Sequence, residues 1–229
     1  MSTISAVCVP EFIHSDQMDL FLSKVSPEKT RRIAKFMHDG DRYRSLLGEV
    51  LIRSTVIEQT GASNDQIRFV YNSYGKPSLE HDPGFSFNLS HSGNWVVLLW
   101  DKGGPALGID VEQIVPIDLG IAEHCFTPRE NAELHSRTGR GRLEYFYRLW
   151  TLKECFVKAS GKGLSMPLDA FSMIYSDRFG WFSPEAESFH FTCFFLDSTH
   201  ILSACSSHGP LPGAVRMTSL DALYDNLNN

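Results

Sequence analysis

The sequence predicts an α+β fold built from two similar halves. Segments with helical and with strand periodicity both occur, and each half runs through strand, helices and then hairpins. A Gly103-Gly104-Pro105 break lies near the middle of the 229 residues. We therefore expect an N-terminal half at residues 1–104 and a C-terminal half at residues 105–229. A Tyr-Arg pair recurs in the two long predicted helices, at Tyr43-Arg44 and Tyr147-Arg148, which is a weak sign of duplication.

The first half contains two predicted helices. One begins at Ser26-Pro27-Glu28, with Ser as N-cap and Pro at the first helical position, and should extend to about Met37. After an expected break at Asp39-Gly40, the second repeats apolar residues at helical spacing and ends at Gly61, since glycine is a common C-cap. The remainder reads as strands, at residues 67–71, 85–90 and 95–100. The last two strands flank a short turn at residues 91–94 and predict a β-hairpin.

The second half starts with a predicted strand at residues 107–112, where Leu107, Ile109 and Val111 alternate with smaller or acidic residues. Thr127-Pro128-Arg129-Glu130 matches a capping box, which explains Glu130 and predicts a helix start. A long helix should follow at about residues 143–160. Residues 168–206 read as short strands.

Composition excludes several classes of protein. Hydrophobic residues make up 42% and charged residues 21% of the chain, which is ordinary for a globular protein. The net charge of −6 argues against a nucleic-acid binder. The first ten residues lack a secretory leader, and the apolar run at residues 95–100 is too short to span a membrane. The five cysteines are scattered without a Cys-x-x-Cys pair, so we expect reduced thiols in a soluble cytoplasmic protein.

Two acids on the strand at 107–112 are candidate metal ligands. Side chains two apart on a strand face the same way, so Asp110 and Glu112 can direct their carboxylates toward one point. Hard oxygen ligands suit Mg²⁺, which usually completes its shell with water and phosphates. The alternative is a pair of solvated acids, and an isolated Asp-x-Glu by itself favours that alternative.

The long helix carries a second group of charged residues. Glu154 and Lys158 are four apart with the acid first, so a surface salt bridge worth roughly 0.2–0.5 kcal/mol explains them when taken alone. It does not explain why Trp150 and Lys153 lie beside them. Gly161-Lys162-Gly163 is a weak phosphate-binding signal without P-loop spacing, and Gly161 is expected as a C-cap.

Three further polar groups have both a functional and a structural interpretation. Ser90-His91 either faces a cleft or forms a hydrogen-bonded hairpin turn. Tyr74-Gly75-Lys76-Pro77 is either a turn or a rigidly presented lysine. A cluster of basic residues is either a solvated helix face or a polyphosphate site. This cluster contains Lys29, Arg31, Arg32, Lys35, Arg42 and Arg44.

The order of these signals resembles the 4′-phosphopantetheinyl transferase family. The matching motifs are Lys29 and Arg44, Tyr74-Gly75-Lys76-Pro77, Phe87-Asn88-Leu89-Ser90-His91-Ser92, Gly108-Ile109-Asp110-Val111-Glu112, Phe126-Thr127-x-x-Glu130 and Trp150-Thr151-x-Lys153-Glu154-x-x-x-Lys158. They cover about residues 26–170. The Gly-Ile-Asp-x-Glu and Trp-x-x-Lys-Glu-x-x-x-Lys blocks in this order are highly specific. The long, single-chain surfactin-synthetase-activating type matches better than the half-length trimeric type.

The resemblance implies a fold, an activity and a set of site residues. The fold has two similar halves about a pseudo-twofold axis, with the active site at their seam, in a monomer. The activity is transfer of the phosphopantetheine arm of coenzyme A to a serine of a carrier protein, with release of 3′,5′-ADP. The implied Mg²⁺ ligands are Asp110, Glu112 and Glu154. The implied coenzyme A contacts are Lys29, Arg32, Arg44, Gly75, Lys76, Pro77, Ser90, His91, Asp110 and Lys158. Arg32 departs from the family pattern, which often has lysine there.

The implied chemistry suits these residue types. Mg²⁺ would neutralise the pyrophosphate, Glu154 would take the serine proton directly or through a bound water, and Lys158 would stabilise the leaving phosphate. Two rival functions remain: a Mg²⁺-dependent nucleotide phosphohydrolase, and a non-catalytic module that binds carrier proteins or coenzyme A. A Ser-His-Asp hydrolase is disfavoured because no Gly-x-Ser-x-Gly occurs. The sequence does not specify which carrier protein is served.

Overall fold

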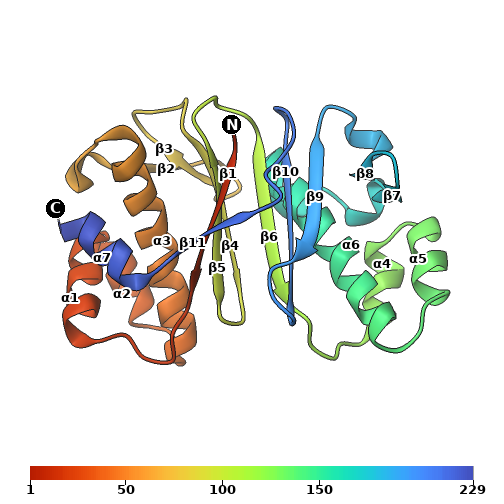
Figure 1. The fold of residues 1–229 in the computed structure, drawn as a ribbon, viewed down its shortest axis with the longest axis horizontal. Coiled ribbons are helices and arrows are strands. Elements are labelled where there is room, and N and C mark those ends of the chain that lie inside the picture. Colours follow the sequence, from red (N-terminus) through yellow and green to blue (C-terminus); the bar gives the residue numbers. More distant parts are fainter. Residues whose placement is uncertain (229) are drawn as a thin grey trace.

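The computed structural model describes residues 1–228 and has an α+β fold with two central sheets (Figure 1). The first sheet has the order β11 (Val215–Thr218), β1 (Thr3–Cys8), β5 (Trp95–Asp101), β4 (Ser86–Ser92). The second has the order β6 (Leu107–Gln113), β10 (His200–Ser206), β9 (His190–Phe195). Two short hairpins complete the strands: β2 (Phe69–Tyr71) with β3 (Pro77–Leu79), and β7 (Ile174–Ser176) with β8 (Gly180–Phe182).

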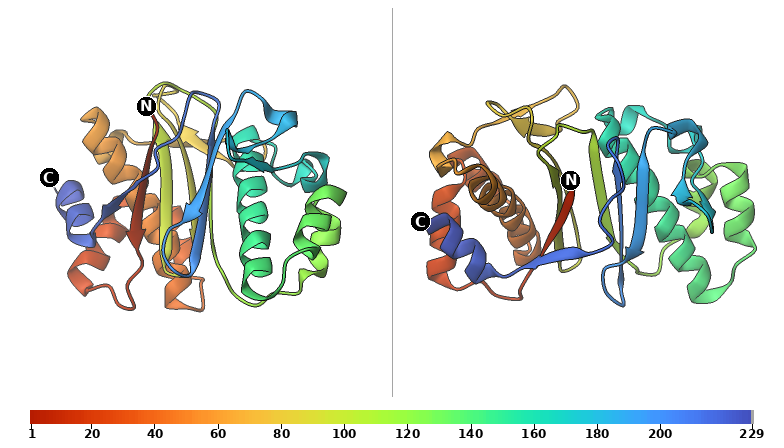
Figure 2. Two further views of the ribbon diagram at one scale, coloured as in Figure 1. Left: turned by 45° about the vertical axis from the view of Figure 1, so that its right-hand side comes forward. Right: turned by 45° about the horizontal axis from the view of Figure 1, so that its top comes forward.

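Helices cover the outer faces of both sheets. On the first sheet lie α1 (Ser15–Lys24), α2 (Pro27–Ile33), α3 (Asp39–Thr60) and α7 (Leu220–Asn228). Beyond the second sheet lie α4 (Ala122–Cys125), α5 (Pro128–His135) and α6 (Gly139–Ser160). Figures 1 and 2 show α3 and α6 on opposite sides of the paired sheets. The layers therefore run helix, sheet, sheet, helix, and the predicted α+β class is confirmed.

The core has three parts that follow these layers. One apolar cluster fills the space between α3 and the first sheet, and a second surrounds α6. The third lies where the two sheets face each other. Its buried residues are Ile4, Ala6, Trp95, Val97, Leu99, Leu107, Ile109, Val111, Leu202 and Ala204. Because this third cluster draws on both sheets, the two halves share one buried interface.

The long helices end where the sequence predicts but begin earlier. Gly61 and Gly161 both adopt left-handed conformations, with φ of 72° and 68°, and terminate α3 and α6. Helix α3 begins at Asp39, so Asp39-Gly40 is its first turn and not a break; an acid in the first turn suits the helix dipole. Helix α6 begins at Gly139, four residues before the predicted start.

Helix α2 is shorter than expected. It has the predicted Ser26 cap, whose hydroxyl accepts the N–H of Lys29, but it ends at Ile33 and not near Met37. Tighter bonds replace the helical ones after that residue, since the N–H groups of Lys35 and Phe36 donate to carbonyls three residues back. The predicted hairpin at residues 85–100 is present as β4 and β5.

The sequence patterns did not predict the elements at the two ends of the chain, which lie side by side: β1 and α1 at the start, and β11 and α7 at the end. Strand β1 pairs with both β5 and β11, and helix α1 contacts α7. The predicted boundary at residue 104 separates the strands of the two sheets up to residue 214. Residues 215–228 then return to the first half, where β11 runs parallel to β1 and Leu223 and Leu227 are buried. Because this tail packs with the first half, the structure does not decide the division at 1–104 and 105–229, which stays a prediction.

Within residues 1–228, no helix combines the length and the apolar character needed to cross a bilayer.

Candidate active site

Strand β6 presents two acids to helix α6. The buried side chains of Leu107, Ile109 and Val111 face the first sheet, so the alternate residues Asp110 and Glu112 face the other way. Asp110 is only 4% exposed, whereas Glu112 is half-buried. The predicted alternation is therefore confirmed, and Asp110 at least is no solvated surface acid.

A glycine allows α6 to lie directly against β6. A Cβ atom at Gly108 would stand 1.7 Å from the carbonyl oxygen of Cys155, so any larger residue would force the helix away. This contact brings Lys158 to Asp110, with 2.6 Å between Nζ and Oδ1. The Lys158 ammonium also donates to Ser90 Oγ at 3.0 Å. The missing side chain of one glycine thus sets the distance between strand and helix at the site.

The simple surface salt bridge on α6 is not found. Within residues 1–228 no ion pair joins Glu154 to Lys158, because the lysine turns to Asp110 across the strand–helix interface. Glu154 is half-buried. Burial raises the pKa of Glu154, the negative charge of Asp110 raises it further, and Lys158 opposes both. The helix therefore carries its charged residues toward the acids of β6.

Negative charge accumulates at the three acids Asp110, Glu112 and Glu154, and Lys158 is the base that opposes it. Burial raises the pKa of Glu112, and so does the nearby Asp110, while a hydrogen bond from Ser92 lowers it. Asp110 Oδ2 is buried and, among the described residues, has no hydrogen-bond partner. Oxygen donors with a deficit of positive charge fit a hard divalent cation such as Mg²⁺. Within residues 1–228, however, no three His, Cys, Asp or Glu side chains converge closely enough to hold a metal ion.

The loop around Lys76 reaches the end of α6. Lys76 Nζ donates to the carbonyls of Lys158 at 2.6 Å and Leu107 at 3.0 Å, and burial lowers the pKa of this lysine. A cavity of about 190 Å³ lies beside it. Its lining residues are Tyr74, Gly75, Lys76, Pro77, Asn88, Leu89, Val157, Lys158, Gly161 and Gly163. The structure thus brings the predicted Gly75, Lys76, Pro77 and Lys158 together. The Lys76 ammonium itself is bonded to carbonyls at the C-terminal end of α6.

Two of the predicted basic residues, Arg44 and Lys29, act electrostatically on His91. Partial burial lowers the pKa of His91, and the positive charges of Arg44, Lys158 and Lys29 lower it further. Arg44 donates to Asp41 at 2.6 Å and to the Gly93 carbonyl at 2.5 Å, which fixes it beside the β4–β5 turn. Lys29 and Arg32 line a separate cavity of about 600 Å³. Positive charge from both halves therefore meets near His91.

Ser90 has more contacts than a hairpin turn requires. Its Oγ donates to Asp110 Oδ1 at 2.8 Å and accepts the backbone N–H of Val111 at 3.4 Å. Together with the contact from Lys158, these bonds place the hydroxyl among the acids of the site. The turn interpretation of Ser90 is wrong, since β4 continues through Ser92.

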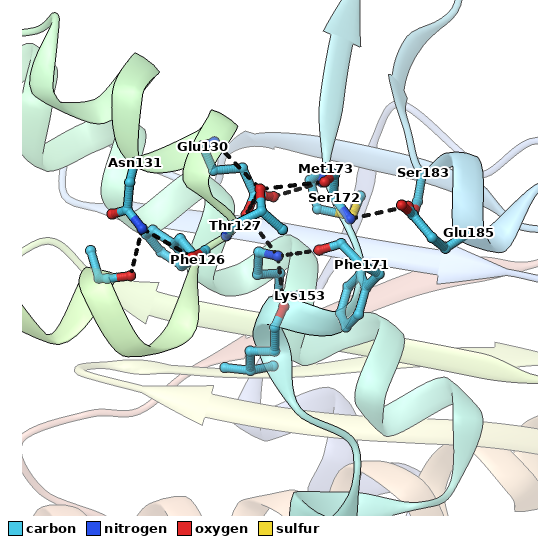
Figure 3. A network of polar contacts seen from close by, with 12 residues as sticks. Phe126, Thr127, Glu130, Asn131, Lys153, Phe171, Ser172, Met173, Ser183 and Glu185 are labelled. Carbon is cyan, nitrogen blue, oxygen red and sulfur yellow. Dashed lines mark hydrogen bonds and ion pairs between the residues drawn. The ribbon is translucent and has the colours of Figure 1, made fainter.

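Glu130 does more than close a capping box. It accepts the N–H of Thr127 as predicted, but it is also buried and lies 2.9 Å from Lys153 Nζ. The Met173 N–H donates to its other oxygen at 2.7 Å. Lys153 donates in addition to the carbonyls of Leu168 and Phe171 (Figure 3). The explanation of Glu130 as a cap alone was incomplete, because its partners are 23 and 43 residues away in the sequence.

Sequence reasoning missed Ser92, whose hydroxyl donates to Glu112 at 2.7 Å. The available signal was the two-residue spacing from Asn88 through Ser90 to Ser92, which places all three side chains on one face of β4.

Comparison with known proteins identifies the family of the chain. A model of the 4′-phosphopantetheinyl transferase superfamily matches residues 106–202, and one described as 4′-phosphopantetheinyl transferase, N-terminal, matches residues 14–102. The 4′-phosphopantetheinyl transferase ffp of Bacillus subtilis is 38% identical over 92% of this chain and 95% of that protein. The 4′-phosphopantetheinyl transferase Sfp of Bacillus subtilis strain 168 is 37% identical over the same shares. The chain therefore belongs to the 4′-phosphopantetheinyl transferase superfamily.

Proposed function

We propose that this chain transfers the 4′-phosphopantetheine arm of coenzyme A to a serine hydroxyl of an apo carrier protein and releases 3′,5′-ADP. The observation that carries the proposal is its likeness, along nearly the whole chain, to proteins named 4′-phosphopantetheinyl transferases. The meeting of acids and bases between β6 and α6 supports it, since a pyrophosphate substrate needs positive charge beside its reacting phosphorus.

The basic residues around His91 bind the nucleotide end of coenzyme A. In this assignment Arg44, Lys29, Arg32 and His91 hold the 3′-phosphate. The support is electrostatic, because the charges of Arg44 and Lys29 both act on His91, and Arg32 acts on Lys29. The loop at Gly75, Lys76 and Pro77 holds the rest of the nucleotide at the cavity of about 190 Å³ that it lines, and Ser90 assists through its contact with Lys158.

Asp110, Glu112 and Glu154 would hold one Mg²⁺ once the two half-buried glutamates turn toward Asp110, because the three carboxylates do not converge in the described residues 1–228. The buried, unpartnered Oδ2 of Asp110 and the raised pKa values of both glutamates support this assignment. When bound, the cation neutralises the pyrophosphate charge that would repel an incoming hydroxyl.

In the transfer, the serine oxygen forms a bond to the β-phosphorus of coenzyme A, and the bridging P–O bond breaks. The Glu154 carboxylate takes the serine proton. The bridging oxygen keeps the bonding electron pair and leaves on 3′,5′-ADP, where the Lys158 ammonium stabilises its charge. The chain supplies no nucleophile of its own, because that group belongs to the carrier.

The enzyme works as a cytoplasmic monomer on carriers of peptide, polyketide or fatty acid synthesis. One chain supplies both sides of the seam, so a second copy is not needed. Sedimentation should show activity in the monomer peak, and activity confined to an oligomer would contradict this proposal.

The test is incubation with coenzyme A, Mg²⁺ and a panel of apo carrier proteins, followed by intact-mass measurement. We expect one phosphopantetheine increment on the carrier and none on the enzyme. A carrier with its acceptor serine changed to alanine is the control. Consumption of coenzyme A without any carrier would favour the phosphohydrolase. Binding without turnover would favour a non-catalytic module.

A further inference from the structure

Side chains of β4 take the place of a neighbouring strand along one edge of β6. Strand β6 pairs with β10 on its other edge. On the near edge, Asn88 Oδ1 accepts the N–H of Ile109 at 2.8 Å, and Ser92 Oγ accepts the N–H of Gln113 at 3.1 Å. Ser90 accepts the N–H between them, from Val111. Three side chains at two-residue spacing thus satisfy donors that an edge strand would leave open.

Two of these three side chains also contact the acids. Because each serine oxygen accepts a backbone N–H, its single hydrogen is free to be donated elsewhere. Ser90 donates to Asp110 and Ser92 donates to Glu112. In the part of the chain that the structure describes, no hydrogen bond joins the Asn88 side chain to either acid. The register of β4 against β6 is therefore coupled to the orientation of both candidate ligands.

The two acids differ in how firmly they are held. Asp110 is buried and is bonded to Lys158 as well as Ser90. Glu112 is half-buried and has a longer side chain, and within residues 1–228 Ser92 is its one hydrogen-bond partner. A glutamate loses considerable rotamer freedom when it is fixed in one orientation. The hydrogen bond from Ser92 fixes the Glu112 side chain in advance, and so reduces the entropy that the side chain loses when a ligand binds.

We propose that Ser92 is a positioning residue, which orients the Glu112 carboxylate toward the bound divalent cation. The inference rests on the proposed function, because it places Glu112 among the cation's ligands. Partners that orient a metal ligand contribute to metal affinity although they do not touch the metal.

The test measures Mn²⁺ affinity by electron paramagnetic resonance, with coenzyme A present, for the wild type and the Ser92→Ala variant. We expect Ser92→Ala to weaken Mn²⁺ binding about 10-fold. The Mg²⁺ concentration for half-maximal transfer should rise by a similar factor, while kcat at saturating Mg²⁺ changes little. Ser92→Thr keeps the hydroxyl and should restore the affinity.

The control is Ser86→Ala, on the same strand but away from both acids, which should bind Mn²⁺ as the wild type does. Wild-type Mn²⁺ affinity in folded Ser92→Ala would overturn the inference, and so would a Ser92→Thr protein as weak as Ser92→Ala. If the wild type modifies no carrier while Ser92→Ala still weakens Mn²⁺ binding, the proposed function fails and the role of Ser92 stands. If transfer occurs and the affinity is unchanged, the inference alone fails.

Discussion

At the scale of single residues, Asp110 defines the candidate site through an imbalance between its two oxygens. Oδ1 receives Lys158 and Ser90, whereas the buried Oδ2 has no partner. Leaving a buried carboxylate oxygen unsatisfied is costly, so such a group usually has a functional reason or a ligand to bind. The carboxylates of Glu112 and Glu154 add negative charge nearby, and Lys158 is the base that opposes the raised pKa of both glutamates.

The decisive change at this scale is Glu154→Gln. It keeps the shape of the side chain but removes both the proton acceptor and one candidate cation ligand. We expect transfer to fall by at least about 100-fold, the usual contribution of a general base. Intact-mass kinetics on an apo carrier measure the rate, and circular dichroism checks the fold. Asp110→Ala should cost as much, and the double mutant little more, since residues that act as a unit are not additive.

The matched control is Glu144→Gln on the same helix, whose carboxylate pairs with Arg140 at 2.7 Å. Loss of this helix pair should leave activity unchanged and cost less than about 1 kcal/mol of stability. If folded Glu154→Gln modifies the carrier at a near wild-type rate, the catalytic assignment of Glu154 is wrong.

At the scale of elements, the site depends on how closely α6 packs against β6. Gly108→Ala should destabilise the protein by about 3 kcal/mol, because the new methyl group meets helix backbone that cannot rotate aside. Transfer should fall as well, since Lys158 would move away from Asp110. Urea unfolding at neutral pH measures the first effect.

Gly141→Ala provides the comparison within α6. A Cβ at Gly141 meets nothing within 4 Å, and alanine favours a helix more than glycine does. This variant should be as stable as the wild type or more stable. Equal stability of the Gly108 and Gly141 variants would show that the close approach of α6 to β6 is not required.

The buried Lys153–Glu130 pair joins α6 to α5, and Lys153 also binds η4 (Leu168–Ala170) and Phe171, which follows it. Lys153 is fully buried and Glu130 is 2% exposed. Lys153→Met should cost about 3–5 kcal/mol, because it leaves a buried carboxylate without its cation. Thermal and urea unfolding measure the loss. Adding Glu130→Gln should recover a large part of it, and a double mutant as unstable as Lys153→Met would contradict this account.

The sequence predicted those features that depend on interactions between residues close together in the chain. The capping box at Thr127, the C-caps Gly61 and Gly161 and the alternation along β6 were all readable, because each depends on neighbours within a few residues. The assignment of Asp110, Glu112 and Glu154 as cation ligands comes from the order of motifs and stays a prediction. Their partners were not predictable in this way. Lys158 pairs with Asp110 and not with Glu154, four residues before it, because the contact between α6 and β6 brings Asp110 close.

At the scale of the whole molecule, the chain joins its halves through contacts that sequence periodicity does not reveal. The tail returns to pair β11 with β1, and β4 side chains bind the edge of β6. A third connection lies beside the contact between Ser92 and Gln113, since Ser92 pairs with Trp95. The indole N–H of Trp95 on β5 donates to Asp197 Oδ2 at 2.7 Å, in the turn between β9 and β10. The two halves are therefore expected to unfold together.

The Asp197 contact gives this cooperation a pH dependence. Burial by itself would raise the pKa of Asp197, but hydrogen bonds from Trp95, the Thr199 N–H and His200 hold it well below the usual range. As the pH falls, the unfolded chain therefore takes up a proton at this carboxyl before the folded chain does. The stabilisation is fully present above the ordinary value of about 3.9 and is lost as the pH drops below it.

We therefore expect Asp197→Asn to be clearly less stable than the wild type at pH 7, with a gap that narrows at pH 3. Urea unfolding midpoints at both pH values measure this gap. Asp177→Asn is the control, because Asp177 is exposed and, within residues 1–228, makes no ion pair or hydrogen bond. Its gap to the wild type should be small at both pH values. A constant Asp197→Asn gap from pH 7 to pH 3 would mean that the turn needs the shape of this side chain and not its charge, and that Trp95 joins the halves by packing alone.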